Sequence, residues 1–260
     1  MIRALWTAGT GMAAQQTNLD VISNNLSNVN TSGFKKSRAD FADLMYQNMR
    51  QAGASTGDDS ELPSGIQMGH GTRLVATQKI YTQGSLQSTG NDLDIAIQND
   101  GFFQITMPDG TLAYTRDGSF QKDSQGRVVT SEGYPLEPAI TIPDNATAIT
   151  ISSEGIVTAT IPTGTEELGQ ITLARFINNA GLESLGGNLL KETVASGAPL
   201  VNNPGEEGAG TLVQEYVEMS NVQVVEEMVN MIVAQRAYEI NSKAITTADS
   251  MLETAASLKR

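Results

Sequence analysis

Glycine and proline are unevenly distributed along this chain of 260 residues, and their absence from its C-terminal end limits the possible folds more than any other feature. All eight prolines lie between Pro63 and Pro204, and no glycine follows Gly210. These two residues are the poorest helix formers. The sequence therefore predicts one long helix from about residue 215 to the C-terminal end.

Apolar residues recur every seven positions along this predicted helix, at Val217, Val224, Met231, Tyr238, Ile245 and Leu252. Such a heptad pattern is typical of a helix that packs along another helix. The companion position three residues later is filled by Ala234, Ala248 and Ala255 but interrupted by Ser220, Glu227 and Asn241. A second apolar stripe adds more surface than one partner helix would cover, and it consists of Val222, Val225, Val229 and Ile232.

The N-terminal segment carries a matching pattern, in which Leu5, Met12, Leu19 and Leu26 lie seven residues apart. It predicts a second amphipathic helix. Asn, Thr, Ser and Gly residues cluster at 28–33, and Gly33 can adopt a positive φ angle. We therefore expect this helix to end there.

The middle of the chain has the pattern of β-strands. Turn sequences such as Pro-Asp-Gly at 108–110 and Glu-Gly at 132–133 recur every seven to nine residues, and short apolar segments at 102–107, 111–115 and 127–130 lie between them. This spacing predicts antiparallel hairpins. The fold class is α+β, with terminal helices that form a coiled-coil-like axial domain around a central antiparallel β-rich domain. The predicted division is a helical assembly domain at 1–45 and 215–260, an extended or β connector at 46–90 and 186–214, and a β-domain at 91–185.

The apolar surface of the terminal helices exceeds what their mutual pairing would bury. Burial of about ten Leu, Ile, Val or Met side chains at ~2 kcal/mol each would drive association strongly. The pattern favours a subunit that assembles with copies of itself. An ordinary intramolecular helix bundle is the alternative that the pattern leaves open.

Composition argues against several other classes of function. The formal net charge is −13 and most of it lies in the middle of the chain, which disfavours nucleic acid and anionic membranes as partners. The chain has no cysteine and one histidine, His70, so the usual zinc sites cannot form. We expect no catalytic residues, no metal and no cofactor. The first residues continue a helical pattern, so we interpret them as mature protein and not as a cleaved signal peptide.

One segment resembles a known signature. Residues 23–35 read Ser-Asn-Asn-Leu-Ser-Asn-Val-Asn-Thr-Ser-Gly-Phe-Lys, and the flagellar rod and hook axial proteins carry A-N-N-L-A-N-x-x-T-x-G-F-K. The chain departs from this signature only at Ser23 and Ser27. Further stretches, above all residues 229–244, are similar to a rod member of that family.

This resemblance implies a structural role and no enzymatic activity. It implies paired terminal helices that line a hollow, stiff shaft, with the β-domain outside, and transmission of torque from motor to hook. The implied partners are copies of the chain, other rod subunits, the hook protein, the flagellar export apparatus and the surrounding basal-body rings. The implied location is the basal body within the cell envelope.

In this family, a segment like residues 46–65 distinguishes the straight rod from the hook.

We expect the assembly interface to contain Leu5, Met12, Leu19, Asn24, Asn25, Leu26, Asn28, Gly33, Phe34, Val217, Val224, Met231, Tyr238, Ile245 and Leu252. The alternatives are a proximal rod or hook subunit, or a β-rich module that binds cell-wall glycan.

Overall fold

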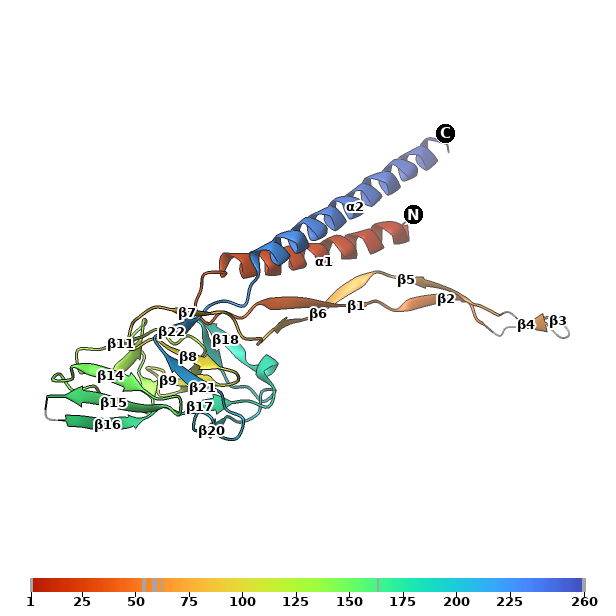
Figure 1. Ribbon diagram of the computed structural model, residues 1–260. Helices are drawn as coiled ribbons and strands as arrows, with labels where there is room; N and C mark the ends of the chain where they lie inside the picture. Colours follow the sequence, from red (N-terminus) through yellow and green to blue (C-terminus); the bar gives the residue numbers. More distant parts are fainter. Residues whose placement is uncertain (1, 53–54, 58–59, 62, 163, 259–260) are drawn as a thin grey trace. The chain divides into compact units, whose positions relative to one another are not determined.

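The chain forms two compact units, a helical unit and a β-unit (Figure 1). The computed structural model describes residues 2–52, 55–57, 60–61, 63–162 and 164–258. The helical unit comprises residues 1–26, 37–78 and 223–260, and the β-unit comprises residues 27–36 and 79–222.

Two long helices carry the ends of the chain, α1 (Ile2–Ser27) and α2 (Val224–Ser257). The prediction that the first helix ends near residues 28–33 is confirmed, because a turn follows Ser27 and Gly33 has a φ of 68°. The second helix begins later than predicted. Val217 lies not on a helix but in strand β22 (Tyr216–Glu218), where it pairs with Gln87 of strand β7 (Leu86–Ser88). Its place in the heptad spacing is therefore coincidental, and its side chain is buried.

An antiparallel ribbon makes up the rest of the helical unit. Strand β1 (Ser37–Asp43) pairs with β6 (Thr72–Lys79), β2 (Tyr46–Arg50) with β5 (Ile66–Gly69), and β3 (Ser55–Gly57) with β4 (Ser60–Glu61). The ribbon thus begins at residue 37, within the segment that the sequence-based division assigned to the helical domain. Met45, Tyr46 and Met49 on the ribbon are exposed.

The β-unit is built from antiparallel sheets. Its largest sheet has the order β18-β19-β10-β9-β17-β20, with β13 also paired to β9. These strands are β18 (Glu183–Gly186), β19 (Leu189–Lys191), β10 (Leu112–Thr115), β9 (Phe102–Thr106), β17 (Leu173–Arg175), β20 (Leu200–Asn202) and β13 (Leu136–Glu137).

Smaller sheets complete the β-unit. They are β14 (Ala148–Ile151) with β15 (Ile156–Ile161) and β16 (Gly164–Gln170), β11 (Phe120–Lys122) with β12 (Val128–Thr130), β8 (Ile95–Gln98) with β21 (Thr211–Gln214), and β7 with β22. The predicted combination of terminal helices with a central, mostly antiparallel β-rich region is confirmed. Residues 186–214, which the sequence-based division placed in a connector, supply strands β19, β20 and β21 to this unit.

Aromatic and branched side chains form the core of the β-unit. Phe103 and Phe120 pack edge to face with ring centroids 5.1 Å apart, and Ile95, Ile97 and Leu136 are buried around them. A second cluster lies around Phe102, Tyr114 and Phe176. The chain segments that lead into the two helices, residues 28–36 and 216–222, belong to the same unit as this core.

Candidate functional site

Helices α1 and α2 lie side by side within the helical unit (Figure 1). They approach closely at Gly11, where a Cβ atom would lie 2.9 Å from the Asn241 amide nitrogen. The most buried side chains of α2 are Glu227, Ala234 and Ala248, and those of α1 are Ala8, Ala14, Ile22 and Asn25. Four of these seven buried residues are alanines.

Most of the predicted seam residues on the two helices are half-buried. Met231, Ile245 and Leu252 on α2 are half-buried, and so are Leu5, Met12, Leu19 and Leu26 on α1. Val224 and Tyr238 are exposed. Glu227 and Asn241 interrupt the heptad in the sequence. In the structure Glu227 is buried and Asn241 is half-buried.

Asn25 of the signature has a clear structural role in the helical unit. Its Nδ2 atom donates to the Ser37 carbonyl oxygen and its Oδ1 atom accepts from the Ser37 backbone N–H, both at 2.9 Å. The same Nδ2 atom lies 3.4 Å from Oε2 of Glu227. Asn25 is only 2% exposed and Glu227 only 4%. The amide side chain therefore pairs with a peptide group as a neighbouring strand would, and it fixes the start of β1 to the end of α1.

The turn after α1 belongs to the β-unit. Thr31 Oγ1 donates to Oδ1 of Asn28 at 3.2 Å, and the Gly33 N–H donates to the Glu218 carbonyl oxygen at 2.7 Å. A Cβ atom on Gly33 would lie 2.6 Å from the Asp117 backbone nitrogen, so no larger residue fits here without a shift. Both the positive φ angle and the lack of space explain why the signature has glycine at this position.

A buried ion cluster follows directly. Lys35 Nζ lies 2.6 Å from Oε1 of Glu218, and Arg116 Nη1 lies 3.1 Å from Oε2 of the same carboxylate. Burial lowers the pKa of Lys35 below its ordinary value, while the adjacent Glu218 carboxylate opposes that shift. The Asn24 side chain of the signature is exposed, and Phe34 is half-buried.

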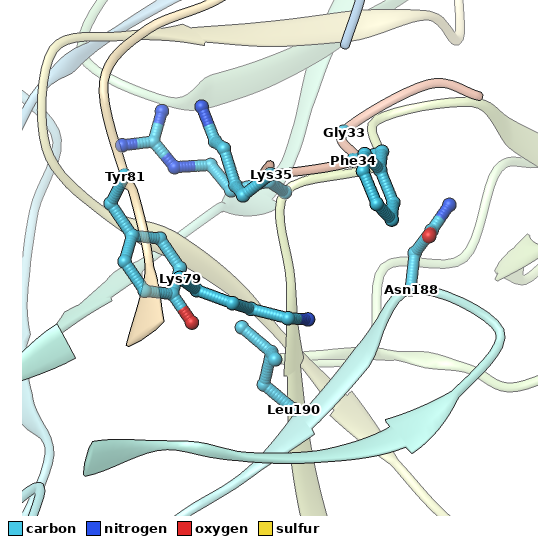
Figure 2. Close-up of a pocket in the computed structure, with 8 residues that line it drawn as sticks. Gly33, Phe34, Lys35, Lys79, Tyr81, Asn188 and Leu190 are labelled. Carbon is cyan, nitrogen blue, oxygen red and sulfur yellow. The ribbon is translucent and has the colours of Figure 1, made fainter. Parts of the chain in front are cut away.

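A small cavity of about 20 Å³ adjoins the cluster, with room for about one water molecule. Figure 2 shows side chains that line it, with Lys79, Tyr81 and Leu190 grouped away from Phe34 and Asn188. Burial lowers the pKa of Lys79 and raises the pKa of Tyr81 to about 12. The Tyr81 hydroxyl is buried and has no hydrogen-bond partner in the described part of the chain. These groups fit a packed junction and not a substrate site.

Exposed apolar side chains cover another face of α2. Five of them within the first third of the helix are each more than half exposed, and they are Val225, Met228, Val229, Ile232 and Val233. Three belong to the second stripe predicted from the sequence, whereas Val222 is buried in the β-unit. Trp6 and Ile2 on α1 are also exposed. The sequence-based interface did not include Trp6, Met228 or Val233. Trp6 follows Leu5 directly, so it lies off the heptad face that guided the prediction.

The residues that the structure describes give little support for a metal site or a membrane-spanning helix. No three His, Cys, Asp or Glu side chains among them are placed to hold a metal ion. Neither described helix combines the length and the hydropathy needed to cross a bilayer. His70 lies in the short loop between β5 and β6.

Paired terminal helices joined to an inserted antiparallel β-unit define the class of flagellar axial proteins, and three family descriptions match the chain accordingly. Residues 5–35 match "Flagella basal body rod protein", residues 96–159 match "Flagellar hook protein FlgE/F/G D1 domain", and residues 213–258 match "Flagellar basal body rod FlgEFG protein C-terminal". The two terminal matches include Lys35 and Glu218, the partners of the buried ion pair.

Full-length relatives narrow the assignment. The chain is 57% identical over 264 residues to the flagellar basal-body rod protein FlgG of Borreliella burgdorferi, with all of both chains covered. It is 56% identical over 255 residues to FlgG of Buchnera aphidicola subsp. Schizaphis graminum, covering 97% of this chain and 98% of the relative, and 42% identical over 269 residues to FlgG of Bacillus subtilis, with all of both covered. The chain belongs to the FlgG family of flagellar basal-body rod proteins.

Family membership confirms the prediction of a structural subunit of the flagellar rod. It also implies assembly with other rod and hook components of the basal body.

Proposed function

We propose that this chain is a non-enzymatic subunit of the distal rod, which polymerises through its terminal helices into a stiff, hollow shaft that transmits torque from motor to hook. The observation that carries this proposal is the exposed apolar face of α2, formed by Val225, Met228, Val229, Ile232 and Val233. The contact between α1 and α2 lies elsewhere on the helix and leaves this face uncovered.

The energetics favour association with other subunits. Burial of five such side chains at ~2 kcal/mol each would contribute roughly 10 kcal/mol per face. Association costs about 4–15 kcal/mol in lost freedom of motion. One such contact is therefore marginal, whereas a subunit that contacts several neighbours in a polymer exceeds the cost. Weak single contacts and a stable lattice are the expected properties of a chain that must stay monomeric until it reaches the growing end.

The half-buried residues of the helix contact also have a place in this proposal. Leu5, Met12, Leu19, Met231 and Ile245 retain partly open surfaces. In an assembled rod they would be covered by helices of neighbouring subunits. The acidic β-unit would face outward and keep the shaft soluble.

Export and location follow from the same role. We propose delivery by the flagellar export apparatus without a cleaved signal peptide, residence in the envelope-spanning part of the basal body, and passage through the surrounding rings. Copies of the chain, other rod subunits and the hook protein are the proposed direct partners.

The test replaces single residues on the apolar face. Val229→Asp and Ile232→Asp should abolish straight polymers in electron micrographs of concentrated protein and leave cells without a complete rod. Asn230→Asp is the matched control, because it adds the same charge at an exposed position beside the face. We expect the control to assemble normally. Tyr238→Asp tests the heptad residues in the same way. Normal polymers from Val229→Asp and Ile232→Asp, with the β-unit folded, would refute the proposal.

A further inference from the structure

We propose that Glu218 is a positioning residue that couples the two chain segments leading into the terminal helices, so that neither residues 28–36 nor residues 216–222 stay docked on the β-unit without the other. The coupling itself depends only on the β-unit. Its consequence for polymer regularity rests on the proposed function.

One residue gathers donors from three separate segments of the chain. Glu218 Oε1 accepts from Lys35 Nζ at 2.6 Å and from the Gly84 N–H at 2.8 Å, and Oε2 accepts from Arg116 Nη1 at 3.1 Å. The backbone carbonyl of Glu218 accepts from the Gly33 N–H at 2.7 Å. The segment after α1 is therefore bound to the segment before α2 through both a side chain and the backbone.

The two cations cannot easily turn to solvent if the carboxylate is lost. Lys35 Nζ also donates to the Thr82 carbonyl oxygen at 2.8 Å, and Arg116 Nη2 donates to the Asn99 carbonyl oxygen at 2.6 Å. The side chains of Lys35 and Arg116 are 3% exposed and that of Glu218 is 0% exposed. Without Glu218, two buried positive charges would lose the carboxylate that both contact, which is strongly unfavourable.

A second link joins the same two segments. Asn221 Oδ1 accepts from the Lys36 N–H at 2.8 Å, and its Nδ2 atom donates to the Ile80 carbonyl oxygen at 2.8 Å. Lys36 in turn accepts at its carbonyl from the Ile80 N–H at 2.9 Å. Gly33, Lys35 and Lys36, which contact the C-terminal segment, thus lie close together in the N-terminal one.

An ionic cluster suits a role in register better than a role in stability. Apolar side chains of similar volume often replace a buried ion pair without loss of stability, because the desolvation cost disappears with the charges. A buried charge, however, is stabilised only when an opposite charge lies within contact distance. A slip of one residue in one direction would bring Phe34 to the Glu218 carboxylate, and Phe34 can form neither contact of Lys35. The cluster therefore disfavours such a slip of the N-terminal segment.

The first test measures amide hydrogen exchange in dilute, full-length protein. Glu218→Gln should speed exchange at the Gly33 and Lys36 amides on the N-terminal side by roughly 10²-fold or more. Reciprocally, Lys35→Met should speed exchange at the Met219 amide, which donates to the Ser85 carbonyl oxygen at 2.9 Å.

Lys122→Met is the matched control, since Lys122 pairs with Asp144 at 3.1 Å but the side chains are 36% and 99% exposed. We expect no more than roughly a fivefold change of exchange near it. Unchanged exchange at Met219 in Lys35→Met would overturn the coupling, as would unchanged exchange at Gly33 in Glu218→Gln.

The second test separates positioning from stability. The triple variant Lys35→Met, Arg116→Met, Glu218→Leu leaves no unpaired charge, so it carries the test even if Glu218→Gln fails to fold. We expect it to melt within a few degrees of the natural protein but to form polymers of irregular diameter and curvature. Uniform, straight polymers from this variant would refute the positioning role. If the natural protein itself never polymerises, the proposed function fails, and the exchange experiment still decides the coupling.

Discussion

Replacement of Gly33 by alanine tests whether the turn after α1 is restricted by backbone conformation alone or also by lack of space. Gly33 has a φ of 68°, and its Cβ position lies 2.6 Å from the Asp117 nitrogen and 2.8 Å from the Arg116 carbonyl carbon. Gly90 in the same unit has a φ of 69° and no atom within 4 Å of its Cβ position. The two glycines therefore share a backbone conformation and differ in their surroundings.

The magnitudes follow from these two environments. A left-handed conformation costs an L-residue about 1–2 kcal/mol, and the Gly→Ala change returns about 0.4–1 kcal/mol by restricting the unfolded chain. Gly90→Ala should therefore lower the free energy of unfolding by roughly 0.5–1 kcal/mol. Gly33→Ala adds overpacking against backbone atoms, which costs about 1–3 kcal/mol, so its total should reach roughly 2–4 kcal/mol.

The assay must report on the β-unit. The single tryptophan, Trp6, lies on α1 in the helical unit, so its fluorescence is unsuitable. Amide exchange of the core strands β9 and β10 as a function of urea gives the free energy of unfolding of the correct unit. Equal losses of stability in the two variants would mean that Asp117 and Arg116 move away at no cost, and the steric argument would then be refuted.

Two further predictions concern packing in each unit. Tyr81→Phe should raise the stability of the β-unit by about 1 kcal/mol, because it removes a buried hydroxyl without a partner among the described residues. Tyr114→Phe should lower the stability of the same unit by about 1 kcal/mol, because the Tyr114 side chain forms a hydrogen bond with Glu192. Thermal unfolding of the two variants gives both values, and an equal shift in the two would contradict the assignment. Ala234→Leu should destabilise the contact between α1 and α2 by about 1–3 kcal/mol through overpacking, whereas Ala244→Leu at an exposed position should change it by less than about 0.5 kcal/mol. Trp6 fluorescence during urea unfolding measures this pair, and a tolerated Ala234→Leu would show that the helices do not pack closely there.

Local patterns in the sequence predicted much of the secondary structure. The absence of glycine and proline after Gly210 indicated α2, and the Asp-Gly and Glu-Gly turns indicated β9, β10 and β12, because both signals depend on the conformation of a few adjacent residues. The predicted start of α2 was about nine residues too early for the same reason. Val217 fits a heptad by spacing, but its backbone pairs with Gln87, a partner that no local pattern reveals.

The functional surface was predictable only in part. The exposed stripe of Val225, Val229 and Ile232 follows from helical periodicity, and the structure leaves it exposed. The contact between the helices was predictable in part, because Ala234 and Ala248 occupy the companion heptad position and are buried, whereas Gly11 lies outside the heptad pattern. Gly11 comes close to the Asn241 side chain, and Ala234 and Ala248 are buried on α2. The Lys35–Glu218 pair joins residues 183 positions apart, and no periodicity connects them.

The positions of the signature now divide into those that bind and those that only fill space. Asn25 needs both its donor and its acceptor for the Ser37 peptide group, and Lys35 needs its charge for Glu218. Gly33 needs to lack a side chain. Ser23 and Ser27, where the signature has alanine, are exposed, so a small polar replacement costs little there. The chain therefore departs from the signature at two exposed positions, Ser23 and Ser27. It matches the signature at Asn25, Gly33 and Lys35, where the described structure requires the amide, the missing side chain and the charge.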